Sequence, residues 1–189
     1  LCYYFNGVSN KWFKNYDAAI SSLEIGAEFV VENQNLLLEF YSSLADVYHT
    51  TNQHKLSDEY YEKVLAIDPD NVLVLNNYAY YLSIRKINLE KAKEMSFRCN
   101  ELEVDNGTYQ DTYAWVLYEL KQYALAKKWL LKALLNGSDK SAVVVEHYGD
   151  ILYKLGEVDE ALNQWKKARE LGDASEFLDQ KIKEGKLYE

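Results

Sequence analysis

The side chains best suited to chemistry are two groups of histidine and carboxylate residues. His147 lies beside Glu146 and three residues before Asp150, and His49 lies three residues after Asp46. Imidazole and carboxylate groups one helical turn apart can hold a metal ion, but neither group has an established ligand spacing. The sequence also lacks a nucleophile elbow, a glycine-rich phosphate loop, an H-E-x-x-H motif and a paired C-x-x-C motif. We therefore predict that the protein is not an enzyme and holds neither a cofactor nor a metal.

The elements that position these residues follow from the stretch 38–71. Its apolar residues recur at spacings of three and four, as in two amphipathic helices joined by a short polar turn. Ala45 and Ser57 are small residues in the middle of the two apolar stripes, so the helices can pack closely. Pro69 disfavours helical geometry in the residue before it, and Asn71 can cap the next helix. Because the pattern recurs about every thirty-four residues, we predict a stack of helical hairpins.

Each hairpin carries a matched pair of small residues. The other pairs are Gly7 and Ala19, Ala79 and Ala92, Ala114 and Ala126, and Gly149 and Ala161. The predicted segments are 1–37, a degenerate first hairpin; 38–71, 72–106, 107–140 and 141–173, four regular hairpins; and 174–189, a capping helix and tail. Gln34–Leu37 is expected to extend a second helix or form a looser connection. In the capping helix, Phe177, Leu178 and Ile182 should face the last hairpin, and Asp179, Lys181, Lys183 and Glu184 should face water.

The motifs Leu44-Ala45-x-x-Tyr48, Ser57-x-x-x-Tyr61 and Pro69 resemble the tetratricopeptide repeat (TPR). This resemblance implies an all-α fold: a TPR-type α-solenoid, a right-handed superhelix of antiparallel helix hairpins with a C-terminal capping helix. Residues 75–83 and 111–118 resemble large TPR proteins of Bacteroidetes-type bacteria, many of them exported, which implies the C-terminal block of a longer protein. The compartment is unknown from the sequence, with export or a periplasmic location through a leader upstream of Leu1 as the alternative.

The resemblance also implies a concave groove lined by the first helices of the hairpins, and hence a scaffold that binds a protein or peptide. Tyr80, Trp115, Tyr118 and Tyr153 are expected to supply flat contact area, and neighbouring carboxylates to favour a basic or neutral peptide. A free carboxylate would meet these acidic side chains without a cation to offset them. The alternative is a solvated inner face with packing between repeats. The groove positions are Asp46, His49, Asn76, Asn77, Tyr80, Asp111, Trp115, Tyr118, Glu119, Glu146, Asp150 and Tyr153.

Composition narrows the class of partner. The formal charge of −9 and the pI near 4.9 argue against nucleic acid, whose binders carry a basic face. No apolar run reaches the length of a membrane span, so we predict no membrane insertion. Cys99 takes a small-residue position and is predicted to be buried. The first hairpin should expose Tyr3, Tyr4, Phe5, Trp12 and Phe13, so self-assembly as a homodimer, or stacking on upstream repeats, is the alternative function.

Overall fold

The computed structural model describes residues 1–172 and 174–188, and the part of the chain that it describes is all-helical. The end of the predicted fifth hairpin, residue 173, and residue 189 lie outside the described residues. None of the described helices is both long and apolar enough to cross a bilayer. The helices are α1 (Cys2–Trp12), α2 (Tyr16–Glu28), α3 (Gln34–Thr50), α4 (His54–Ile67), α5 (Val72–Ile84), α6 (Leu89–Leu102), α7 (Gly107–Glu119), α8 (Tyr123–Leu135), α9 (Ala142–Lys154), α10 (Val158–Leu171) and α11 (Leu178–Glu184), with a 3-10 turn at Ser138–Lys140.

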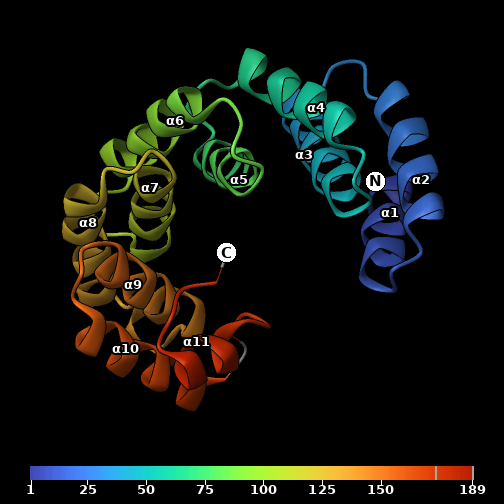
Figure 1. Ribbon diagram of the computed structural model, residues 1–189. Coiled ribbons are helices and arrows are strands. Elements are labelled where there is room, and N and C mark those ends of the chain that lie inside the picture. Colours follow the sequence, from blue (N-terminus) through green and yellow to red (C-terminus); the bar gives the residue numbers. More distant parts are fainter. Residues whose placement is uncertain (173, 189) are drawn as a thin grey trace. The chain divides into compact units, whose positions relative to one another are not determined.

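The helices form two compact units, residues 1–78 and the chain from residue 79 onward. In the first unit, α1 packs on α2, α2 on α3, and α3 on α4. In the second, α6 packs on α7, α7 on α8, α8 on α9, α9 on α10, and α10 on α11. Figure 1 shows the successive antiparallel pairs within each unit. Each unit is therefore built from helix hairpins whose cores lie between neighbouring helices.

Three-residue turns close four of the hairpins, and the middle residue of each has a positive φ. A left-handed residue reverses the chain there but strains any side chain other than glycine. The turn between α5 and α6 is one residue longer, as the spacing of Ala79 and Ala92 predicted. The left-handed residues are Lys14, Asn52, Lys121 and Gly156 in the short turns, and Lys86 and Asn88 in the longer one.

Every member of the matched small-residue pairs is buried, as the sequence pattern predicted. At two of these positions even a methyl group does not fit. A Cβ atom on Gly7 would lie 2.5 Å from Leu23 Cγ, and one on Gly149 would lie 2.4 Å from Trp165 Cδ1. Cys99 is also fully buried, as predicted. The small residues therefore set how closely the two helices of a hairpin approach.

Two expectations about helix boundaries were wrong. Gln34–Leu37 neither extends α2, which ends at Glu28, nor forms a loose connection; it is the first turn of α3. The reason is the cap, since the Asn33 side chain accepts a hydrogen bond from the backbone N–H of Leu36 at 3.0 Å. The last helix begins at Leu178 rather than at residue 174.

Candidate functional site

The second unit contains a cavity of about 390 Å³ with a mostly apolar and aromatic lining. Its wall comes from the end of α5 and the turn after it, from α7 and α9, and from the segment 174–188. The apolar side chains Val143 and Phe177 are 40% and 41% exposed at its mouth. The lining residues are Tyr80, Ile84, Lys86, Trp115, Glu119, Val143, Glu146, His147, Asp150, Ala174, Ser175, Phe177, Lys181 and Tyr188.

A buried cation joins the two carboxylates of α9. Lys181 on α11 is only 3% exposed, and its Nζ donates to Glu146 Oε1 at 2.8 Å. The same Nζ contacts the two carboxylate oxygens of Asp150 at 2.8 and 2.7 Å. Trp165 Nε1 also donates to Asp150 at 2.8 Å, and the backbone N–H of Ser175 donates to Glu146 at 2.9 Å. The expectation that Lys181 faces water was therefore wrong, because these carboxylates hold it inside.

The two carboxylates respond differently to this environment. Burial raises the pKa of Asp150 to about 6, although Lys181 and His147 act in the opposite direction. Burial also acts to raise the pKa of Glu146, but hydrogen bonds from Lys181 and Ser175 outweigh it and hold that pKa below its ordinary value. The cluster is therefore sensitive to the loss of its one buried lysine.

Stacked rings form a second wall of the cavity. The Trp115 ring stacks on the Tyr118 ring, at a centroid distance of 4.6 Å, and on the His147 ring, at 4.1 Å. His147 Nδ1 lies 3.0 Å from Asp111 Oδ1. Burial disfavours protonation of this imidazole, but the charge of Asp111 and its hydrogen bond raise the pKa of His147. This contact fixes the orientation of the imidazole ring beneath Trp115.

The group of His147, Glu146 and Asp150 is thus an ion-pair cluster with Lys181 and Asp111. No set of three or more potential metal ligands is found among residues 1–172 and 174–188.

The cavity is less acidic than the sequence suggested. Lys86 Nζ lies 3.4 Å from Glu119 Oε2, so this carboxylate also has a cation close to it. Lys181 neutralises part of the charge of Glu146 and Asp150. The expectation that these carboxylates lack an offsetting cation was wrong. The cations were missed because they come from a turn and from the last helix, outside the positions that the TPR resemblance assigns to a groove.

Of the predicted groove residues in the second unit, Tyr80, Trp115, Glu119, Glu146 and Asp150 line the cavity. The other three have supporting positions. Tyr118 is 3% exposed and belongs to the hydrophobic core, so its predicted role as a free contact surface was wrong. Asp111 contacts His147, and the Tyr153 ring stacks on Trp165 at 5.7 Å.

The four predicted groove residues of the first unit lie on α3 and α5. Asp46 accepts hydrogen bonds from Lys11 Nζ at 3.0 Å and from the Tyr61 hydroxyl at 2.5 Å. The His49 ring lies 5.2 Å from that of His54. Asn76 donates to the side-chain oxygen of Asn77 at 3.3 Å. Asp46 therefore connects α1, α3 and α4, as a structural residue would.

Sequence reasoning missed the part of the cavity that follows α10. Ser175, Phe177, Lys181 and Tyr188 lie beyond the last hairpin, where no repeat register applies. A signal was present in the spacing of Phe177 and Lys181, which are four residues apart and would share a face of the helix predicted there. Lys181 was instead predicted to face water together with the charged residues Asp179, Lys183 and Glu184.

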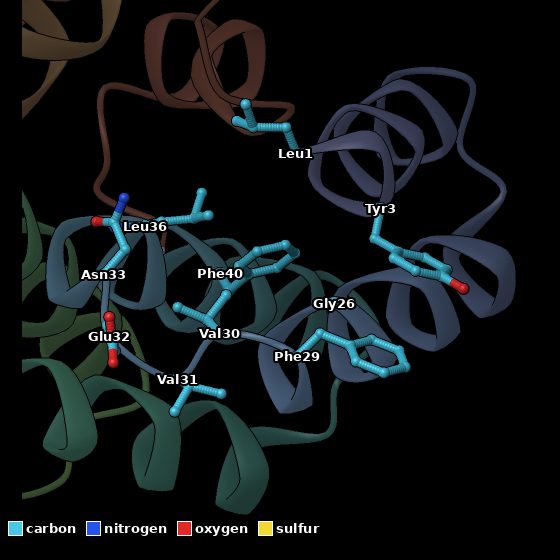
Figure 2. A pocket seen from close by; sticks show the side chains of 10 residues that line it. All are labelled: Leu1, Tyr3, Gly26, Phe29, Val30, Val31, Glu32, Asn33, Leu36 and Phe40. Atoms are coloured by element: carbon cyan, nitrogen blue, oxygen red, sulfur yellow. The ribbon is translucent and has the colours of Figure 1, made fainter.

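A second apolar hollow of about 390 Å³ lies in the first unit, beside the connection from α2 to α3. Figure 2 shows Val30, Leu36 and Phe40 gathered on one side of it and Tyr3 and Phe29 on the other. The Tyr3 and Phe29 rings stack with their centroids 6.0 Å apart.

The first hairpin also exposes an apolar edge. Trp12 is 83% exposed, and Phe13, Phe5 and Tyr3 are also exposed. Tyr4 differs from the expectation. Its ring packs edge-on against Phe40 with the centroids 5.4 Å apart, and its hydroxyl donates to Glu39 at 3.0 Å.

Comparison with known proteins agrees with this architecture. Two family models described as tetratricopeptide repeat match residues 38–71 and 60–94. Residues 38–94 contain tetratricopeptide repeats. The chain is 32% identical over 116 residues to the type IV pilus assembly protein PilF of Pseudomonas aeruginosa, a match that covers 60% of this chain and 45% of PilF. It is 30% identical over 87 residues to the TPR repeat-containing protein PA4667 of the same organism, covering 46% of this chain and 14% of that protein.

The chain thus spans less than half the length of both curated relatives. Among solved structures, Pseudomonas aeruginosa PilF superposes with a TM-score of 0.78 at 23% identity, covering 97% of this chain and 85% of that one. A MamA structure (AMB-1) superposes with a TM-score of 0.72 at 22% identity, and the match covers 90% of this chain and 98% of MamA. A thermophilic TPR protein of Thermus thermophilus superposes with a TM-score of 0.71 at 19% identity, and the match covers 95% of this chain and 94% of that protein. The fold is therefore the predicted TPR-type α-solenoid.

Proposed function

We propose that the protein is a non-catalytic scaffold that binds a segment of another protein in the cavity of the second unit. The observation that carries this proposal is the combination of an open apolar mouth, formed by Val143 and Phe177, with the flat ring of Trp115 inside. Concave sites lined by apolar and aromatic side chains, with a few fixed polar groups, are the usual form of a binding pocket. A TPR fold is compatible with this role but does not by itself assign it.

The charges around the cavity favour a neutral segment that inserts an apolar side chain. Lys181 and Lys86 neutralise part of the carboxylate charge, so neither a strongly basic nor a strongly acidic partner is required. Burying an apolar side chain in the cavity gains about 25 cal/mol for each Å² removed from water. We therefore narrow the basic or neutral peptide inferred from the sequence to a neutral one. The name of PilF, an assembly protein, supports a role in holding proteins together.

A peptide array compares capture by the native protein with capture by a Val143→Ser, Phe177→Ser double variant. The two side chains are partly exposed at the mouth of the cavity, so their replacement should leave the core intact. Val158→Ser is the matched control because Val158 is 42% exposed on α10 and does not line the cavity. We expect the double variant to lose captured peptides that the control retains. Equal capture by all three proteins would refute the proposal.

A second candidate function, self-association, rests on the apolar edge of the first hairpin. Trp12 and Phe13 lie next to each other at the end of α1 and are both largely exposed. A large exposed apolar surface usually marks a protein-binding site. In a symmetric dimer the same edge of a second copy would cover it.

Light scattering over a range of concentrations tests this second candidate. We expect a dimer that a Trp12→Ser, Phe13→Ser variant no longer forms. Leu135→Ser, which changes an equally exposed residue on α8, should keep the dimer. A monomer at all concentrations would exclude self-association through this edge.

A further inference from the structure

The end of the described chain returns to the candidate cavity: Tyr188 forms part of its wall, and Leu187 packs on the core clusters that reach the cavity through Trp115 and Ala174. α11 ends at Gly185, whose φ of 61° is left-handed and turns the backbone sharply. Residues 186–188, which follow it, have no regular secondary structure. In Figure 1 this last segment runs from α11 back past α9.

Two neighbouring side chains of this segment make the contacts. Leu187 packs against two hydrophobic clusters of the second unit, one between α7, α8 and α9 and one between α9, α10 and α11. Tyr188 lines the cavity together with Tyr80 and Trp115, and its hydroxyl donates to the Glu184 carboxylate. Lys186, the residue before this pair, is exposed. The segment therefore binds through an aliphatic residue followed by an aromatic one.

We infer that residues 187–188 occupy part of the binding site as an internal ligand, and that the partner carries a similar short irregular segment with an aliphatic residue next to an aromatic one. This inference rests on the proposed function and specifies the partner of the same site. The partner competes with the chain's own Leu187 and Tyr188. Because the internal segment is tethered by a single turn at Gly185, its effective concentration at the site is on the order of millimolar. A free peptide must bind against that competition.

The test uses a fluorescently labelled peptide, EGKLYE, which has the sequence of residues 184–189, and measures its anisotropy with the full chain. The Leu187→Ser, Tyr188→Ser variant removes the internal competitor. Lys186→Ser is the matched control because Lys186 is in the same segment and is exposed. We expect the double variant to bind the labelled peptide about tenfold more tightly than the wild type and the control do. The peptide EGKSSE should not bind.

Equal binding of EGKLYE to the wild type and the double variant, or no binding to either, would overturn the inference. A dimer of the wild type that disappears in the double variant would also overturn it, because the occupant would then be a second copy. Thermal melting verifies that the double variant is folded. If it is not, Tyr188→Ser alone gives the same comparison, since the Tyr188 side chain lines the cavity without belonging to a core cluster.

The same proteins separate this inference from the proposed function. Some of the captured peptides can depend on Val143 and Phe177 but lack an aliphatic–aromatic pair. If such peptides bind the Leu187→Ser, Tyr188→Ser variant no better than the wild type, only the inference is overturned. If neither these peptides nor EGKLYE depends on Val143 and Phe177, the proposed function fails as well.

Discussion

Lys181→Met removes the buried cation of the second unit while keeping a side chain of similar length. The substitution leaves Glu146 and Asp150, both almost fully buried, without the ammonium group that contacts them at 2.7–2.8 Å. Removing one partner of a buried ion pair typically costs about 3–5 kcal/mol, because an uncompensated charge stays behind. The cost must appear as a loss of folded stability or as detachment of α11 from α9.

The protein can also respond by protonating Asp150, and this makes the loss depend on pH. Holding a carboxyl neutral costs about 1.4 kcal/mol for each pH unit above its ordinary pKa of 3.8. That cost is about 1.6 kcal/mol at pH 5 and about 5.7 kcal/mol at pH 8. The folded variant holds a proton that its unfolded chain releases above pH 3.8, so its stability falls as the pH rises. Asp150 of the native protein, whose pKa is about 6, is itself largely protonated at pH 5, so the two proteins differ less there. We therefore expect a loss below about 2 kcal/mol at pH 5 and of about 3–5 kcal/mol at pH 8, where native Asp150 is ionised and paired with Lys181.

Urea denaturation at pH 5 and pH 8 measures both values. Lys183→Met is the control because Lys183 lies on the same helix but is exposed. It should change the free energy of unfolding by less than about 0.5 kcal/mol at either pH. If Lys181→Met changes the free energy of unfolding as little as this control does, or by the same amount at the two pH values, the buried cluster does not hold α11 as described.

Three other substitutions or reactions test the fold. Gly149→Ala should lower stability by about 1–3 kcal/mol in thermal melting, because its Cβ would lie 2.4 Å from Trp165 Cδ1; an unchanged midpoint would contradict this packing. Lys121→Gly should raise stability by about 0.5–1 kcal/mol in urea denaturation by relieving the left-handed strain at φ 61°, and a loss would argue against that backbone. In a thiol titration at pH 8, Cys2 should react in the native protein and Cys99 only after denaturation, because Cys99 is buried and its pKa is raised to about 12; rapid reaction of both would refute its burial.

The hairpins could be predicted from the sequence because each is a local pattern. The small residues and the apolar stripes repeat, so every pair of helices is defined by residues close together in the chain. Ala114 and Ala126 illustrate this, since both are fully buried at the predicted contact. The first turn of α3 was missed because it depends on a single capping interaction between Asn33 and the backbone of Leu36. Asn71, Asn106 and Ser141 cap the later first helices at an even spacing, whereas Asn33 is displaced from that spacing and so was not recognised as a cap.

The candidate site was predictable only where it follows the repeat. Trp115 and Asp150 line the cavity because α7 and α9 present equivalent positions of successive hairpins. Lys181 was placed on the wrong face, since its partners lie 31 and 35 residues earlier in the chain. Tyr118 was taken for a contact residue, but the core between α7 and α8 buries it. Such long-range pairing depends on tertiary packing, which one sequence does not reveal.

The most direct test of the proposed binding site follows the indole N–H signals of the tryptophans by NMR while a peptide captured on the array is added. Trp115 lies in the cavity, and Trp12 lies on the exposed edge of the first hairpin. We predict that the Trp115 signal shifts and saturates with peptide concentration while the Trp12 signal stays in place. A shift of Trp12 with no change at Trp115 would contradict binding in the cavity and assign the interaction to the first hairpin.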